Sequence, residues 1–104
     1  MATTKPVSRP TGGSDKTGLT LRLYVAGNAP NSNRAVANLR AICDGHFASG
    51  HELEIVDLLL HPQRALADGI IVTPTLLKLM PLPIRRMIGD LSDTSNVLLT
   101  LAGT

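Results

Sequence analysis

The fold is decided by the stretch Leu21-Arg-Leu-Tyr-Val-Ala-Gly-Asn-Ala-Pro-Asn-Ser32, which predicts a strand that runs directly into a helix. Apolar residues at every second position of 19–25 predict a strand with one buried face, and they place Tyr24 on the opposite face. Residues 27–31 then supply a turn, a capping side chain and a proline suited to the first turn of a helix. The helix that follows carries one apolar stripe at three- and four-residue steps, which consists of Ala35, Val36, Leu39, Ile42, Cys43 and Phe47.

The next segment predicts a second strand in the same sheet. Ser49 and Gly50 break the helix, and residues 51–58 alternate between polar and apolar side chains. A strand, a helix and another strand in this order form a right-handed βαβ unit, so we expect the two strands to be parallel. Glu52 and Glu54 share one face of the second strand, and we expect that face to be solvated.

The second half of the chain predicts, in order, a helix, two strands and a helix, which span 62–68, 76–80, 84–88 and 93–102. Ser92 is the expected N-cap of the last helix. Pro74 has no backbone N–H, so it belongs at the entry of the first of these strands, where either a cis bond or an ordinary trans turn proline fits. The complete order β-α-β-α-β-β-α is the thioredoxin-like arrangement of the α/β class.

Two segments of this half fit more than one structure. Ile84, Met87 and Ile88 also match helical spacing, and the apolar run 97–101 is compatible with a strand as well as with a helix. Both assignments satisfy burial, so we expect only a small free-energy difference between two packings of this half.

The chain lacks the residues that a thioredoxin-like redox enzyme needs. Such an enzyme carries Cys-x-x-Cys where the first strand meets the first helix, and no cysteine lies there. Cys43, the one cysteine, lies in the apolar stripe and is expected to be an inert core residue. His46, His51 and His61 do not form a recognised ligand spacing with it, so we assign no metal, cofactor or catalytic residue. Recognition of a partner is favoured over catalysis.

Length and composition restrict the other possibilities. The 104 residues allow one modest core, which we assign to a domain over 19–104 after a flexible extension over 1–18. A net charge of +2 and only two aromatic side chains, Tyr24 and Phe47, argue against nucleic acid as a partner. No segment predicts a signal peptide or a membrane helix, and a single cysteine fits a reducing compartment, so we expect a cytoplasmic protein without a membrane partner.

Three motifs together resemble the KaiB family, namely Leu23-Tyr-Val-Ala-Gly-Asn-Ala-Pro-Asn-Ser32, Thr73-Pro-Thr-Leu76 and Pro81-Leu-Pro-Ile-Arg-Arg-Met-Ile-Gly-Asp-Leu-Ser-Asp93. The resemblance extends from about Leu21 to Leu101. It implies a non-enzymatic clock or timing protein that binds the ATPase KaiC and antagonises its phosphorylation through slow fold switching. It also implies two folds: a thioredoxin-like monomer that binds KaiC, and a homo-oligomeric ground state, a tetramer or a dimer, with the order β-α-β-β-α-α-β.

We infer two sets of candidate positions from this resemblance and from the residue types. The candidate cis-proline and fold-switch residues are Thr73, Pro74, Pro81, Pro83, Gly89 and Asp90. The candidate partner-binding residues, chosen on charge alone, are Arg22, Lys78, Arg85 and Arg86.

Departures from the family pattern suggest a member from outside the cyanobacteria. The chain ends at Thr104 without an acidic tail, and Ala29 replaces the more usual threonine. KaiA or a histidine kinase is a further implied partner where the host has one. The alternative function is a thioredoxin-like adaptor in stress or histidine-kinase signalling that has no clock role.

Overall fold

The polypeptide follows the predicted order of strands and helices. The structure, a computed structural model, describes residues 18–48 and 50–102. The expected flexible extension over 1–18 lies outside the described residues apart from Gly18. No helix within the described ranges is long and apolar enough to cross a lipid bilayer. The elements are β1 (Leu19–Val25), α1 (Pro30–His46), β2 (His51–Asp57), α2 (Pro62–Asp68), β3 (Thr75–Met80), β4 (Arg85–Ile88) and α3 (Thr94–Leu101).

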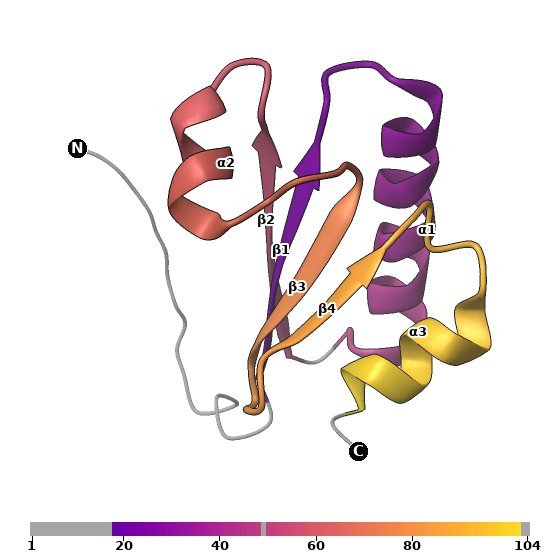
Figure 1. Cartoon of the computed structure of the whole chain (residues 1–104). Coiled ribbons are helices and arrows are strands. Elements are labelled where there is room, and N and C mark those ends of the chain that lie inside the picture. The colour runs from indigo at the N-terminus through magenta and orange to yellow at the C-terminus, as the bar shows by residue number, and fades with distance from the viewer. Residues whose placement is uncertain (1–17, 49, 103–104) are drawn as a thin grey trace.

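The strands form one mixed four-stranded sheet in the order β2-β1-β3-β4 (Figure 1). β1 is parallel to β2, which confirms the predicted βαβ unit, and β3 is antiparallel to both β1 and β4. Leu23 in β1 lies opposite Ile55 of β2 and Leu76 of β3. α1 and α3 cover one face of the sheet, whereas α2 lies against the other face.

Two apolar clusters lie on the two faces of the sheet, because successive side chains of β1 point in opposite directions. The smaller cluster lies on the α2 side and consists of Tyr24, Val56, Ile70 and Leu77. The predicted placement of Tyr24 opposite the leucines of β1 is therefore confirmed. The larger cluster, under α1 and α3, consists of Leu19, Leu21, Leu23, Val25, Ala35, Leu39, Ile42, Cys43, Leu76, Leu91, Val97 and Leu101.

The two segments with alternative assignments each adopt a defined structure here. Residues 85–88 pair with β3 and form an edge strand. In α3, Val97 and Leu101 are buried four residues apart, whereas Leu99 is 63% exposed, which is the burial pattern of a helix. The described fold is therefore the thioredoxin-like one of the two that the family resemblance implies.

Two expected helix caps differ from the structure. The N-cap of α1 is Ala29, which makes no capping hydrogen bond through its side chain. The expected cap of α3, Ser92, instead donates its backbone N–H to Asp90 Oδ1 at 3.0 Å and belongs to the preceding turn. α3 begins at Thr94, and Asp93 caps it, with its carboxylate accepting a hydrogen bond from the Asn96 N–H at 3.2 Å.

We expect Cys43 to resist thiol reagents in the native protein at neutral pH. The side chain is fully buried, and burial raises the pKa of its thiol to about 11, so the reactive thiolate is scarce at pH 7. Labelling with a thiol-reactive dye should require denaturant. Rapid labelling without denaturant would mean that α1 separates readily from the sheet.

We expect Gly27→Ala to destabilise the protein by about 1 kcal/mol in urea unfolding, because φ at Gly27 is +55° and alanine is strained there. The added Cβ would lie 2.7 Å from Leu59 Cδ1, but this side chain is 70% exposed and can move aside. Gly45→Ala is the matched control, since Gly45 lies in α1 with open space around it and alanine favours a helix. Equal destabilisation by both substitutions would contradict the prediction.

Candidate functional site

The turn between β1 and α1 is held by two polar side chains. Ser32, which is buried, accepts a hydrogen bond from the Ala26 N–H at 3.0 Å. Asp57 Oδ1 accepts hydrogen bonds from the Gly27 N–H at 3.0 Å and from the Leu59 N–H at 2.9 Å. The turn itself contains no thiol, hydroxyl or ionisable side chain, so it offers a fixed surface without a nucleophile or a redox group. Among the described residues, no group of three or more His, Cys, Asp or Glu side chains could hold a metal ion.

The loop that enters β3 lies beside the end of β4. The Thr73–Pro74 peptide bond is cis, and Pro74 is buried. The hydroxyl of Thr75 donates a hydrogen bond to the carbonyl of Val72 within this loop. The Gly89 N–H donates to the Pro74 carbonyl at 3.0 Å, which joins two of the candidate fold-switch residues directly.

Asp90 connects the same region to α1. Its carbonyl accepts a hydrogen bond from Asn38 Nδ2 at 2.8 Å, and its carboxylate accepts the Ser92 N–H at 3.0 Å. The hydrogen bonds from Ser92 hold the pKa of Asp90 below its usual range. Leu91, the next residue, has φ +64° and buries its side chain in the larger cluster. The contact with α1 and the burial of Leu91 thus stabilise this turn, although Leu91 has a positive φ that usually favours glycine.

The remaining candidate prolines lie at the opposite end of β3, in the connection to β4. The Met80–Pro81 and Leu82–Pro83 peptide bonds are both cis. Lys78 Nζ donates a hydrogen bond to the Pro81 carbonyl at 2.6 Å. The six candidate fold-switch residues therefore form two separate groups, one at each end of β3, rather than one site.

The four candidate cations do not form one basic patch. Lys78 is only 1% exposed, so the structure does not place it on the surface, as selection on charge alone assumed. It lies opposite Leu21, on the face that α1 and α3 cover. Arg85 and Arg86 are both exposed, and Arg86 Nη1 donates to the Gly69 carbonyl at 3.2 Å.

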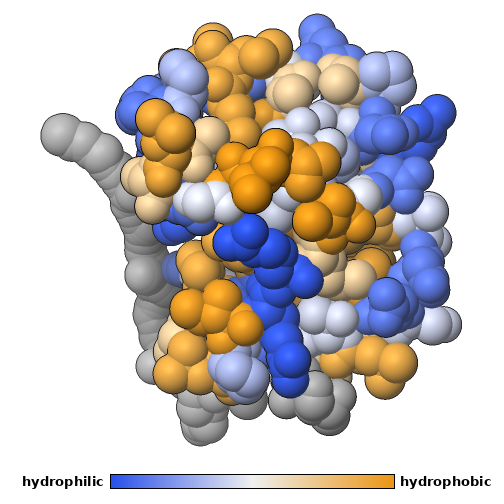
Figure 2. Space-filling view, in the orientation of Figure 1, coloured by the Kyte–Doolittle hydropathy of each residue, from blue (hydrophilic) through white to orange (hydrophobic). Residues whose placement is uncertain are grey.

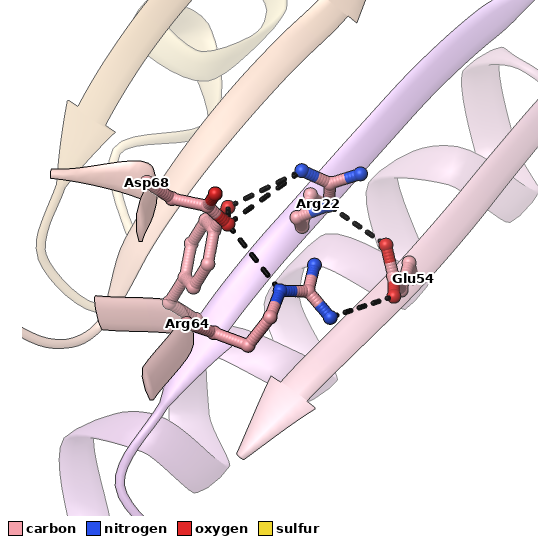
Figure 3. A network of polar contacts seen from close by, with 5 residues as sticks. Arg22, Glu54, Arg64 and Asp68 are labelled. Carbon is pink, nitrogen blue, oxygen red and sulfur yellow. Dashed lines mark hydrogen bonds and ion pairs between the residues drawn. The ribbon is translucent and has the colours of Figure 1, made fainter. Parts of the chain in front are cut away.

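Arg22, the fourth cation, belongs to a network of five side chains that joins α2 to β1 and β2 (Figure 3). Arg22 Nε donates to Glu54 Oε1 at 2.7 Å, and the Tyr24 hydroxyl donates to Asp68 Oδ2 at 2.5 Å. Arg64 Nη1 lies 3.6 Å from Glu54 Oε2, and its Nε lies 3.5 Å from Asp68 Oδ2. Arg22 Nη1 lies 3.8 Å from the same Asp68 oxygen. We call these five residues the polar network.

The hydrogen bond between Tyr24 and Asp68 perturbs both groups. Burial, together with the bond to Asp68, raises the pKa of Tyr24, so the phenol stays protonated and donates. The same bond, supported by the charges of Arg64 and Arg22, lowers the pKa of Asp68. The fold therefore favours ionised Asp68. Its contribution to stability is present at neutral pH and is lost as the pH falls through the lowered pKa.

The polar network is not apparent from the sequence. Glu54 is predicted to lie on a solvated face, yet this half-exposed side chain contacts both Arg22 and Arg64. Two signals were available: Arg22 and Glu54 occupy neighbouring strands of the predicted βαβ unit, and Arg64 and Asp68 are four residues apart on a predicted helix. The register between the strands and the position of α2 were needed to combine them.

Apolar side chains are exposed in the two connections that flank α2, one from β2 and one to β3. Leu59 and Leu60 are 70% and 72% exposed, and Ile71, in the connection between α2 and β3, is 94% exposed. Figure 2 shows a group of hydrophobic residues over this connection. Exposed apolar side chains in such a group are typical of surfaces that contact another protein.

Comparisons of the sequence identify close relatives. A family model described as the KaiB domain matches residues 22–102. The circadian clock oscillator protein KaiB of Prochlorococcus marinus is 53% identical over 81 residues, which cover 78% of this chain and 68% of that protein. The protein of the same name from Synechococcus elongatus is 52% identical over 81 residues, which cover 78% of this chain and 79% of that protein.

Solved structures confirm the thioredoxin-like fold. The N-terminal domain of SasA from Synechococcus elongatus matches with a TM-score of 0.66 and 24% identity, over 95% of this chain and 90% of that chain. The germline-specific thioredoxin Deadhead from Drosophila melanogaster matches with a TM-score of 0.67 and 11% identity, over 85% of each chain. These similarities show the fold alone. The family-model match over 22–102 and the relatives' identity of about one half show that this chain belongs to the KaiB family.

Proposed function

We propose that this protein is a non-enzymatic clock or timing regulator, which binds a KaiC-type ATPase and antagonises the phosphorylation of that ATPase. The observation that carries this proposal is the identity of about one half to circadian clock oscillator proteins. The turn between β1 and α1 supports the non-enzymatic part, because it has neither a nucleophile nor a redox pair.

The proposed mechanism is a slow shift between two folds. The ATPase binds only the thioredoxin-like monomer, and a homotetrameric ground state keeps the population of that monomer low. Slow conversion then delays inhibition of the ATPase, and this delay is the proposed function. The alternative assignments of residues 84–88 and 97–101 support two packings of the second half. The two groups of candidate fold-switch residues at the ends of β3 are the proposed places where the backbone rearranges.

The proposed partner surface in the thioredoxin-like fold includes the exposed cations Arg85 and Arg86. Arg22 is 27% exposed at its side chain, so part of it is also accessible. The exposed apolar side chains of Leu59, Leu60 and Ile71 extend this proposed surface. KaiA or a histidine kinase is proposed as a further partner where the host has one.

The second candidate function is a thioredoxin-like adaptor in stress or histidine-kinase signalling. The observation that favours it is the fold similarity to the SasA N-terminal domain over 95% of the chain. An adaptor with a single stable fold would bind its partner without a preceding conformational change. The kinetics of association therefore discriminate between the two functions.

We expect a complex with a KaiC-type ATPase and ATP to form slowly and to co-elute in size-exclusion chromatography. Because only the minor fold binds, the observed association rate should reach a plateau as the ATPase concentration rises. An association rate that increases linearly at all concentrations would contradict fold switching. No complex after prolonged incubation would contradict the regulator function itself.

At ATPase concentrations below the plateau, we expect Arg86→Glu to slow association with the ATPase by roughly threefold to tenfold, because reversing an exposed charge at a protein interface chiefly changes the association rate. Arg40→Glu is the matched control, since Arg40 is exposed on α1. Surface plasmon resonance at two salt concentrations measures both variants, after circular dichroism has confirmed their folds. Equal effects of the two substitutions would place Arg86 outside the interface.

A further inference from the structure

α2 is held to the sheet by little apolar burial. The helix has seven residues and none of them is buried. Leu66 is 89% exposed, and the apolar contact of the helix with the smaller cluster comes from the half-buried Ala65. A helix of two turns is not stable in water by itself. Other contacts must therefore keep α2 in place.

The polar network supplies those contacts. Asp68 binds the Tyr24 hydroxyl and lies near the Arg22 guanidinium, and both of these groups come from β1. Arg64, one turn earlier in α2, lies near Glu54 of β2. Figure 3 shows the two α2 side chains pointing toward the strands from the same side of the helix. A charged contact thus connects α2 to each of the two strands beneath it.

Both ends of α2 are continuous with short turns that could act as hinges. At the start, the N–H groups of Leu60 and His61 donate to the Asp57 carbonyl at 3.0 Å and 2.9 Å. At the end, Gly69 has φ +70° and the Ile70 N–H donates to the Ala65 carbonyl at 2.9 Å. These turns are where the backbone would have to bend if α2 moved away from the sheet.

The hydrogen bonds of the sheet and the larger cluster include no residue of α2. β1 pairs with β2 and β3 along its length, and its leucines pack under α1 and α3 on the opposite face. Loss of α2 would leave these hydrogen bonds and this larger cluster in place. It would expose the apolar side chains of the smaller cluster, including Val56 and Leu77, to water.

We propose that α2 is a releasable cover, which the polar network holds closed over the smaller apolar cluster and which opens while the sheet and the larger cluster stay folded. The proposal goes beyond the proposed function, because it concerns local opening in the thioredoxin-like fold whether or not an ATPase binds. The open state presents apolar surface on a sheet face that is otherwise covered.

Near neutral pH, the opening of α2 depends more strongly on ionic strength than on pH. The charged and titratable groups around Asp68 are Tyr24 and Arg22 from β1, Glu54 from β2 and Arg64 from α2, while Arg86 from β4 binds the adjacent Gly69 carbonyl. Asp68 stays ionised at neutral pH. Salt weakens attraction between partly exposed charges, since the Debye length is about 10 Å at 0.1 M ionic strength.

Hydrogen exchange of the full-length chain, measured by mass spectrometry at neutral pH, tests the proposal. Amides over 64–70 should exchange faster than those of β1 and β3, and high salt should accelerate this segment selectively. Tyr24→Phe should accelerate it by about tenfold, because it removes the hydrogen bond to the charged Asp68 carboxylate. Asp68→Asn should accelerate it by a similar factor, because it leaves Tyr24 only a neutral acceptor and removes the charge near Arg22 and Arg64. The double variant should accelerate exchange by less than the product of the two single effects, since both substitutions weaken the bond between Tyr24 and Asp68.

Asp44→Asn is the matched control, because Asp44 is an exposed carboxylate on α1. It should leave exchange over 64–70 unchanged. The proposal is overturned if α2 amides exchange at the same free energy as β1 amides. It is also overturned if the two network variants accelerate all segments equally, or if salt has no selective effect. The salt series uses the unaltered protein and stays decisive even where Asp68→Asn fails to fold.

Discussion

The structure depends on the burial of β1 on both faces and its pairing on both edges. Leu23 and Tyr24, which are adjacent in the sequence, are both 0% exposed although they point to opposite sides of the sheet. Burying one large apolar side chain contributes about 1.5–3 kcal/mol, and β1 contributes several such side chains. β2 and β3 pair with β1, and helices cover both of its faces. The alternation of the β1 side chains and the register of its hydrogen bonds therefore determine where these elements lie.

The two faces of the sheet are held by different physical interactions. Under α1 and α3, a large apolar cluster supplies most of the burial, and its contribution does not rely on charge. Under α2, a small apolar cluster is combined with the polar network, whose charged members are partly exposed. Both the turn after β1 and the proposed releasable cover, α2, thus contact β1. The contacts of α2 with the sheet are the weaker of the two, because they depend on partly exposed charges.

The sequence was sufficient for the order of elements up to β3 and for the lack of a cysteine at the turn between β1 and α1. It was insufficient where neighbouring residues compete for one role, as with Ser92 and Asp93 at the start of α3. The choice of Ser92 was wrong because α3 begins one residue later, at Thr94, so that Asp93 occupies the N-cap position. Lys78 was wrongly treated as a surface cation, because charge indicates a preference for water but not the position of the strand that carries the residue.

The sequence by itself determined the βαβ unit of the first half, the opposed faces of β1 and the cysteine-free turn, because these follow from residue type and from local periodicity. Only the tertiary structure decided that 85–88 pairs as a strand, that 97–101 is helical, and that Tyr24 binds Asp68. Tyr24 and Asp68 are 44 positions apart in the chain. A contact of this kind exists only after the sheet register and the packing of α2 bring the two side chains together, so no local pattern could predict it.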